Sequence, residues 1–236
     1  MRKQMFLSSL LFLATCCIIV IPGLRAPLHA QACYCGFDFC GGCVDSGGLC
    51  DAALCTCKYK TPIIIDVDGM GYHLTSAADG VMFKFSPKLA PIRVGWTSAG
   101  SNNAFLALDR NGNGTIDDST ELFGSFTPQP TSAYPNGFKA LAEYDKPQNG
   151  GNGDGFINSG DAVFTKLRLW IDLNHDGISQ PAELFPLPVL GIYSISLDYQ
   201  YTSTFDQFGN MFRFSALVNA ELKTSRLAYD VLLTTH

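Results

Sequence analysis

Residues 172 to 183 have the types and spacing of a calcium-binding loop. A loop of the EF-hand type supplies oxygen ligands from positions 1, 3, 5, 7, 9 and 12, and it turns at a glycine in position 6. With Gly177 at position 6, the ligand positions hold Asp172, Asn174, Asp176, Ile178 (through its carbonyl), Gln180 and Glu183. This alternation of acids and amides suits Ca²⁺; the alternative is an ordinary Asp/Asn/Gly turn. Ser179 stands at position 8, where an apolar residue is usual, and it weakens the strand through which EF-hands pair.

A second loop begins at Asp109 and follows the same pattern. With Gly114 at position 6, its ligand positions 1, 3, 5, 7 and 9 hold Asp109, Asn111, Asn113, Thr115 and Asp117. The acid is one residue late, because position 12 is Thr120 and Glu121 stands at position 13. A loop that is one residue longer can still bring Glu121 to the ion, so the sequence predicts a second calcium site here.

A third, less regular loop begins at Asp145. Counting from Gly155 as position 6, its ligand positions 3, 5, 7, 9 and 12 hold Asn152, Asp154, Phe156 (through its carbonyl), Asn158 and Asp161. Position 1 falls on Gly150, which has no side-chain oxygen; either Asp145 or Asn149 fills the gap, or the site is weak. Residues 66–71 form a fourth acidic segment, but Met70 stands where an oxygen is expected, and we interpret this segment as a turn between strands.

Short elements must position these loops. Alternating or continuous apolar runs predict β strands at residues 63–65, 81–85, 92–96, 193–199, 212–218 and 227–233. Apolar residues at helical spacing predict two helices, one with Phe138, Leu141 and Ala142 and one with Val163, Leu167 and Trp170. The expected fold class is therefore α+β, with short helices and EF-hand-like calcium loops flanked by antiparallel strands.

The N-terminal region has a different composition. Residues 1–32 predict a secretory signal peptide, because a basic start is followed by an apolar run and by small residues; an uncleaved membrane anchor is the alternative. Seven cysteines then lie between residues 33 and 57, which predicts a disulfide-rich segment, with a zinc site at Cys40 and Cys43 as the rival interpretation. Because seven is odd, one account is that Cys33 is the lipidated first residue of a lipoprotein. The expected organisation is a signal peptide (1–32), a Cys-rich segment (33–60) and a calcium-binding domain (61–236).

The charge of the chain favours cations as ligands. The formal net charge is −5, and the predicted signal peptide carries Arg2, Lys3 and Arg25 but no acid, so the mature chain is more acidic still. An acidic chain is a poor partner for nucleic acid phosphates. We expect calcium ions and proteins of the cell envelope or the extracellular space as partners, with membrane contact only through a lipid anchor at Cys33.

Several motifs occur in order between residues 62 and 197. They are IDVDG at 65–69, GW at 95–96, LALDRNGNG at 106–114, ELFG at 121–124, GFKAL at 137–141, LRLWID at 167–172 and GIYSI at 191–195. In these motifs the chain resembles a calcium-dependent module of iron-regulated proteins in the repeat-in-toxin (haemolysin-type calcium-binding) class. The resemblance implies extracellular calcium binding by the Asp109 and Asp172 loops. Some members of the class cleave themselves at an Asp-Pro bond when calcium is added, but this chain contains no Asp-Pro dipeptide and no glycine-aspartate nonapeptide array.

Two functions follow as hypotheses. The leading one is a secreted calcium-binding protein whose loops are ordered by Ca²⁺, acting as a structural or adhesive module of the cell envelope or extracellular space. The alternative is a calcium-dependent, peptidase-like processing module that acts on another chain. The sequence does not favour an enzyme, because His73, His175 and His236 have no recognisable Ser or Cys partner motif. A dockerin is disfavoured, because Asp109 and Asp172 lie too far apart in sequence for its closely spaced loop pair.

Overall fold

The computed structural model describes residues 43, 48–51, 56–222 and 226–235. All of them belong to one compact unit, Ala32–His236. The predicted signal peptide (1–32) and the predicted lipidation of Cys33 lie outside the described residues. Within the described ranges, no helix is long and apolar enough to cross a bilayer.

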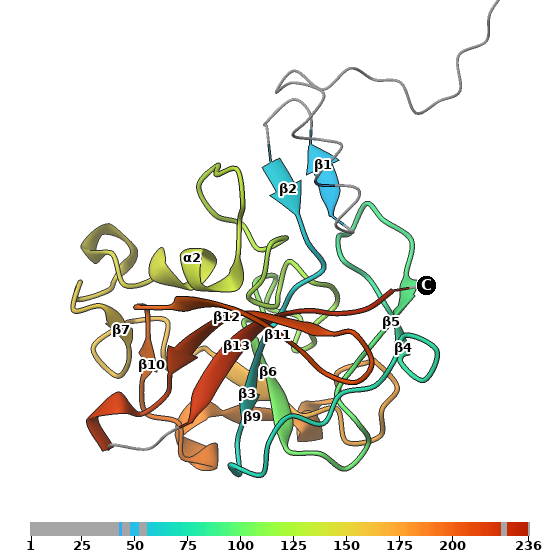
Figure 1. The fold of residues 1–236 in the computed structure, drawn as a ribbon. Helices are drawn as coiled ribbons and strands as arrows, with labels where there is room; N and C mark the ends of the chain where they lie inside the picture. The colour runs from blue at the N-terminus through green and yellow to red at the C-terminus, as the bar shows by residue number, and fades with distance from the viewer. Residues whose placement is uncertain (1–42, 44–47, 52–55, 223–225, 236) are drawn as a thin grey trace, which may run out of the picture. The chain divides into compact units, whose positions relative to one another are not determined.

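A seven-stranded antiparallel sheet organises the domain (Figure 1). Its strands, in order across the sheet, are β11 (Gln200–Phe205), β12 (Met211–Leu217), β13 (Leu227–Leu232), β3 (Ile63–Asp66), β6 (Asn103–Ala107), β8 (Arg168–Trp170) and β9 (Leu184–Pro186). The central strand β3 pairs on one side with β13, where Ile64 faces Tyr229, and on the other side with β6, where Ile64 faces Phe105. Strands that are distant in sequence are therefore neighbours at the centre of the sheet.

Smaller elements surround this sheet. Three two-stranded sheets are formed by β1 (Leu49–Asp51) with β2 (Thr56–Lys58), β4 (Val81–Phe83) with β5 (Ile92–Val94), and β7 (Phe156–Ile157) with β10 (Ile195–Ser196). Helix α2 (Gly137–Ala142) begins after Asn136, whose side chain accepts a hydrogen bond from the backbone of Lys139 and so caps the helix. Four short 3₁₀ helices are η1 (Pro147–Asn149), η2 (Pro181–Glu183), η3 (Leu187–Leu190) and η4 (Ala220–Leu222).

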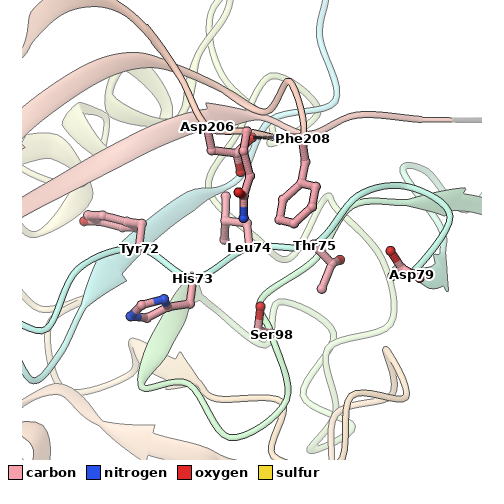
Figure 2. A pocket seen from close by; sticks show the side chains of 9 residues that line it. Tyr72, His73, Leu74, Thr75, Asp79, Ser98, Asp206 and Phe208 are labelled. Carbon is pink, nitrogen blue, oxygen red and sulfur yellow. Dashed lines mark hydrogen bonds between the residues drawn. The ribbon is translucent and has the colours of Figure 1, made fainter.

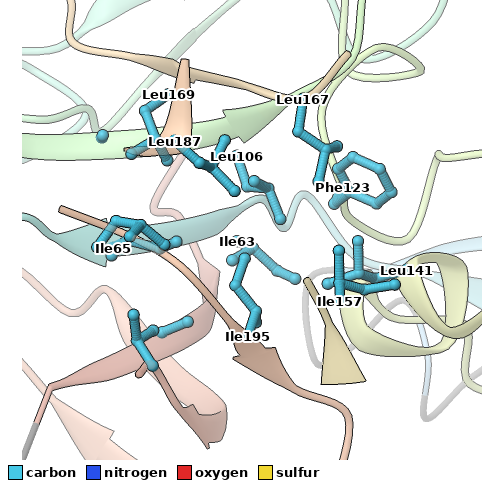
Figure 3. Close-up of a cluster of buried hydrophobic side chains, with 14 of the residues drawn as sticks. Ile63, Ile65, Leu106, Phe123, Leu141, Ile157, Leu167, Leu169, Leu187 and Ile195 are labelled. Atoms are coloured by element: carbon cyan, nitrogen blue, oxygen red, sulfur yellow. The ribbon is translucent and has the colours of Figure 1, made fainter. Parts of the chain in front are cut away.

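Both faces of the central strand β3 are buried. Ile63 and Ile65 of β3 belong to one apolar cluster, shown in Figure 3, whereas Ile64 belongs to the cluster that contains Trp96 and Trp170. Because side chains alternate along a strand, a central strand that is covered on both faces needs a continuous apolar run. This explains the three consecutive isoleucines.

The predicted α+β fold class is wrong: the described domain is mainly β. The helix expected around Phe138 is present as α2, but the one expected around Val163, Leu167 and Trp170 is not. Residues 168–170 instead form β8, and Leu169 and Trp170 point to opposite apolar clusters, as they must in a strand. Pairing with β6 and β9 outweighs the local helical spacing. The Asp109 and Asp172 loops follow strands β6 and β8, and the Asp145 loop follows the short helix α2, so none of the three has the long flanking helices of an EF-hand.

The described part of the predicted disulfide-rich segment contains a disulfide bond. Cys43 and Cys57 form a disulfide bond. Cys50 is also disulfide-bonded. Since Cys43 is bonded to Cys57, it is not a thiolate ligand for zinc.

Candidate metal-binding loops

The first and last carboxylates of the Asp172 loop (residues 172–183) are held by two buried tryptophans. Oδ2 of Asp172 accepts hydrogen bonds from the indole Nε1 of Trp96 (2.7 Å) and from the backbone of Gly177 (2.8 Å). Oε2 of Glu183 accepts one from the indole Nε1 of Trp170 (3.2 Å). Asp172 and Glu183 are only 1% and 3% exposed. The donors that hold them are all neutral, so both negative charges remain uncompensated.

The intermediate ligand positions of this loop converge on one atom. Oδ2 of Asp176 accepts a hydrogen bond from Nδ2 of Asn174 (2.8 Å) and another from Nε2 of Gln180 (3.0 Å). Positions 3, 5 and 9 therefore meet in space. Ile178, the predicted carbonyl ligand at position 7, has an exposed side chain.

Two residues of the loop with positive φ anchor its turn to neighbouring segments. His175 has φ 58°, and its ring nitrogens lie 2.8 Å and 2.9 Å from the backbone carbonyl oxygens of Thr97 and Asp79. Gly177 has φ 72°, and a Cβ atom at this position would lie 2.8 Å from a methyl group of Val81. Only glycine fits both the backbone conformation and the available space.

The Asp109 loop (residues 109–121) repeats this geometry although its last acid is one residue late. Oδ1 and Oδ2 of Asp109 accept hydrogen bonds from the backbone of Gly112 (2.7 Å) and Gly114 (2.8 Å). The carboxylate of Glu121 accepts from the backbone N–H groups at loop positions 2 and 9, both at 2.9 Å. Glu183 accepts from the same two positions of the Asp172 loop, at 2.9 Å and 3.2 Å. The extra residue thus leaves Glu121 in the equivalent place.

The side chains at positions 3, 5 and 9 of the Asp109 loop also converge. Nδ2 of Asn111 and Nδ2 of Asn113 each lie 2.8 Å from Oδ2 of Asp117. The hydrogen bond from Asn111, supported by those from Asn113 and Thr115, lowers the pKa of Asp117. Thr115 donates its hydroxyl to Oδ1 of Asp117 at 3.0 Å. The carboxylate at the meeting point is thereby held in its ionised form.

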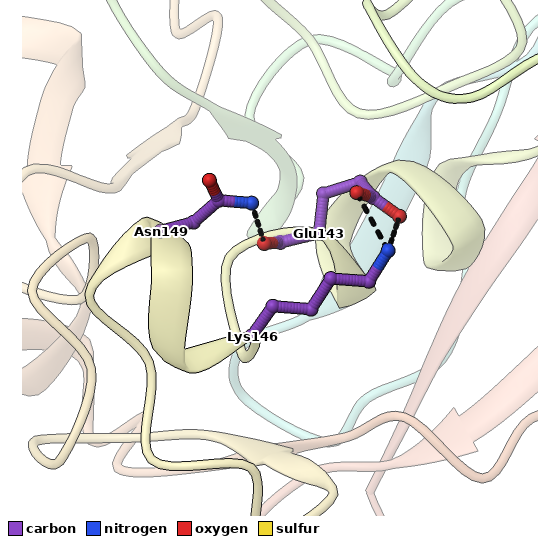
Figure 4. Close-up of polar contacts among 3 residues, drawn as sticks. All are labelled: Glu143, Lys146 and Asn149. Carbon is purple, nitrogen blue, oxygen red and sulfur yellow. Dashed lines mark hydrogen bonds and ion pairs between the residues drawn. The ribbon is translucent and has the colours of Figure 1, made fainter.

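In the Asp145 loop (residues 145–161), Asp145 fills position 1. Its Oδ1 and Oδ2 accept hydrogen bonds from the backbone of Gly153 (2.9 Å) and Gly155 (3.0 Å), as Asp109 does with the glycines of its own loop. The other candidate, Asn149, instead donates its amide to the carbonyl oxygen of Glu143 at 2.6 Å (Figure 4). Asp145 therefore has the backbone hydrogen bonds of a position 1 residue, and Asn149 does not; that Asp145 binds an ion stays a prediction.

The rest of the Asp145 loop follows the other two loops. Oδ2 of Asp154 accepts from Nδ2 of Asn152 (2.8 Å) and of Asn158 (3.0 Å), and these bonds, with that from Asn158 the strongest, lower the pKa of Asp154. Asp161 is 3% exposed and accepts from the backbone of Asn158 at 2.8 Å. Phe156 contributes its carbonyl to the predicted set and lies in β7.

Five loop carboxylates are buried and form no salt bridge among the described residues. They belong to Glu121, Asp145, Asp161, Asp172 and Glu183, each 9% exposed or less. Among the described residues the one salt bridge is that between Lys146 of the Asp145 loop and Glu143, and it includes none of these five carboxylates (Figure 4). Buried charges are normally paired or bound to a metal, so these five carboxylates are candidate metal ligands.

The donor set of each loop fits Ca²⁺. In the described part of the chain, no three His, Cys, Asp or Glu side chains gather closely enough to hold a metal by themselves. Each loop instead combines acids with amides and backbone carbonyls, which are the oxygen ligands that Ca²⁺ takes. In each loop the amide nitrogens lie beside the central carboxylate oxygen, where a positively charged group would be favourable. Turning an amide about its last bond exchanges nitrogen for oxygen and makes it a ligand.

A known domain family matches this part of the chain. The match is to the SPM domain and covers residues 63–234, which include all three loops. The chain belongs to the SPM domain family. A curated relative of this SPM domain, the iron-regulated protein FrpA of Neisseria meningitidis serogroup C, is 42% identical over 142 residues, which is 59% of this chain and 12% of that protein. The expected relationship to iron-regulated proteins is confirmed at this level, whereas calcium binding by the loops stays a prediction.

Several residues that shape the loops of the SPM domain were not found from the sequence. They include Trp96 and Trp170, whose indoles bind loop carboxylates. They also include Ser179, which contacts Ile116. Trp96 lies 76 residues before Asp172, so no local spacing links the two. The turn at residues 66–71 also has a remote partner, because Oδ2 of Asp68 accepts from Nδ2 of Asn102 at 2.7 Å.

The SPM domain also has a hollow of about 260 Å³ away from the loop ligands (Figure 2). It is lined by Tyr72, His73, Leu74, Thr75, Asp79, Ser98, Asp206, Gln207 and Phe208. Although Ser, His and Asp occur together here, the imidazole of His73 points away from Ser98 and has no described hydrogen bond to Ser98 or Asp206. The described residues of the hollow therefore do not form a hydrolytic triad.

Proposed function

We propose that this SPM domain binds Ca²⁺ in its three acidic loops and that the ions complete the fold of the loops. The supporting observation is the set of five buried loop carboxylates that form no salt bridge among the described residues. The proposed ligands are Asp172, Asn174, Asp176, Ile178, Gln180 and Glu183; Asp109, Asn111, Asn113, Thr115, Asp117 and Glu121; and Asp145, Asn152, Asp154, Phe156, Asn158 and Asp161. When bound, Ca²⁺ supplies the positive charge that these groups lack.

The protein's part is to hold the acids of each loop in place before the ion arrives. In the Asp172 loop, the indoles of Trp96 and Trp170 fix one oxygen each of Asp172 and Glu183 and leave the other oxygens for backbone donors and the ion. Positions 3, 5 and 9 are already gathered at Asp176. Preorganisation of this kind lowers the ordering cost of binding.

We further propose that the protein acts outside the cell, as a structural or adhesive module. The predicted signal peptide and the disulfide between Cys43 and Cys57 support this setting, because disulfides persist in oxidising compartments. Extracellular calcium sites typically have dissociation constants of roughly 10⁻⁴ to 10⁻³ M. A chain exported unfolded would then meet enough calcium to complete its loops.

Thermal unfolding with and without calcium tests the proposal. A site filled at about ten times its dissociation constant adds ~1.4 kcal/mol to the free energy of unfolding, so calcium should raise the melting temperature and a chelator should lower it. Calorimetry should also show that Glu183→Ala weakens calcium uptake, whereas Glu143→Ala, a carboxylate outside the proposed ligand sets, leaves it unchanged. An equal melting temperature in both conditions, with no heat of calcium binding, would refute the proposal.

The alternative is a calcium-dependent processing module that acts on another chain. No observation among the described residues supports it. It is tested separately by incubating the protein with a substrate that contains an Asp-Pro bond, with and without calcium. The chain itself should stay intact on a denaturing gel, because it contains no Asp-Pro dipeptide.

A further inference from the structure

A buried hydrogen bond joins the Asp109 loop to the Asp172 loop. The backbone N–H of Ile116 donates to the hydroxyl oxygen of Ser179 at 2.6 Å, and the same hydroxyl lies 3.5 Å from the carbonyl oxygen of Ile116. Both residues are 3% exposed. Each stands at position 8 of its loop, so the bond connects equivalent points of the two loops.

This bond lies directly beside the proposed ligands on both sides. Ile116 precedes Asp117, and Ser179 precedes Gln180; both of these position 9 residues reach the meeting point of amides and carboxylate in their own loop. Their backbone N–H groups also bind the terminal acids Glu121 (2.9 Å) and Glu183 (3.2 Å). A shift of the backbone at position 8 would therefore move ligands in either loop.

The Asp145 loop has a different neighbour. Its position 8 residue is Ile157, which pairs with Ile195 through the two-stranded sheet of β7 and β10. This loop is thus tied to the segment around β10, and it provides an internal comparison for the other two.

We infer that Ser179 couples the Asp109 and Asp172 loops, so that an ion bound in one loop raises the calcium affinity of the other. The inference rests on the proposed calcium function. An ion that orders position 9 of one loop also orders the shared hydrogen bond at position 8. The second loop then loses less conformational entropy when it binds its own ion. A single buried hydrogen bond corresponds to a coupling of about 3- to 10-fold in affinity.

The two tryptophans make the coupling measurable. They are the only tryptophans of the chain, and both donate to carboxylates of the Asp172 loop, so their fluorescence should report calcium binding in that loop. Asp109→Asn disables the first acid of the coupled loop, and Asp145→Asn makes the same change in the loop without the bond. We expect D109N to raise the calcium concentration at which half of the fluorescence change has occurred by about 3- to 10-fold. D145N should change this midpoint concentration by less than about twofold. Equal shifts in both variants would overturn the coupling.

Ser179→Ala then tests the residue itself, with Ser203→Ala as a control at an exposed serine of β11. In the S179A background, D109N should no longer shift the fluorescence midpoint of the Asp172 loop, whereas in the S203A background the shift should persist. An undiminished shift in S179A would remove Ser179 from the coupling. If S179A does not fold, the comparison of D109N with D145N still decides whether the two loops are coupled.

Calorimetry separates the two levels of failure. Absence of calcium uptake by the unmodified protein would overturn the proposed function and the coupling with it. If the protein takes up calcium but D109N leaves the fluorescence midpoint unchanged, the coupling is overturned and the proposed function stands.

Discussion

The indole nitrogen of Trp96 lies 2.7 Å from Oδ2 of Asp172, and both residues are buried. The contact joins the apolar cluster that contains Trp96 to Asp172, the first residue of its candidate loop. Trp170 stands against Trp96 with its ring centre 5.5 Å away and donates to Glu183 at the other end of that loop. The hydrophobic core and the candidate ligands therefore form one structural unit.

Trp96→Phe should destabilise the protein and weaken its Asp172 loop. The change removes an indole donor from a buried carboxylate, and loss of such a partner costs about 1 to 3 kcal/mol. Urea unfolding in the presence of a chelator measures this cost without any contribution from calcium. Trp170→Phe provides the comparison, because it removes the longer bond of 3.2 Å to Glu183 and should cost less. Unchanged stability in W96F would show that the Trp96 bond does not hold Asp172.

Gly177→Ala should be more harmful than Gly114→Ala, although both glycines stand at position 6 of their loops and both have positive φ. Strain from an unfavourable φ costs about 1 to 3 kcal/mol at either site. At Gly177 the new Cβ also meets Val81 at 2.8 Å, whereas nothing lies within 4 Å of it at Gly114. Thermal unfolding of the two variants in chelator measures the difference. Equal losses of stability in the two variants would mean that the close contact with Val81 adds nothing to the destabilisation.

Asp145→Ala should remove one calcium ion from the bound total, and Asn149→Ala should remove none. Asp145 accepts the backbone hydrogen bonds of Gly153 and Gly155, while the amide of Asn149 binds the carbonyl of Glu143. Calorimetric stoichiometry at saturating calcium distinguishes the two variants. A lost ion in N149A with full binding in D145A would reverse the assignment of position 1.

Asp230→Asn should stabilise the protein at neutral pH but not in acid. Burial raises the pKa of Asp230 from 3.8 to about 6, against the opposing influence of Arg213. A raised carboxyl pKa means that the folded state binds the proton more tightly than the unfolded chain does. Its contribution to stability is therefore full below pH 3.8 and is lost as the pH rises through about 6.

Because asparagine does not ionise, D230N should gain up to about 3 kcal/mol over the unmodified protein at neutral pH, and the gain should vanish as the pH approaches 4. Gly137 keeps an acceptor, since its backbone N–H binds Oδ2 at 2.6 Å and an amide oxygen can take that place. Denaturant unfolding across this pH range provides the measurement, with Asp198→Asn as a control at an exposed acid. A pH-independent difference would show that Asp230 is not the titrating group.

The sequence predicted the loops better than the fold around them. Turn glycines and ligand types follow a fixed local spacing, so the acids at Asp109 and Asp172 could be assigned from the sequence, and the structure gathers them as the spacing requires. The region of Leu167 to Trp170 could not be assigned in the same way, because its apolar spacing suits a helix and only pairing with β6 and β9 makes it a strand. The contacts of Trp96 and Ser179 depend on the completed tertiary fold, and no local pattern contains them.

The position of β3 at the centre of the sheet has a consequence for export. β3 is completed on one side by β13, which lies at the opposite end of the described sequence, so the middle of the sheet cannot close while the chain is still emerging from a membrane pore. Contacts between such distant segments form slowly. For the exported protein proposed above, this topology would delay completion of the sheet until β13 has been translocated.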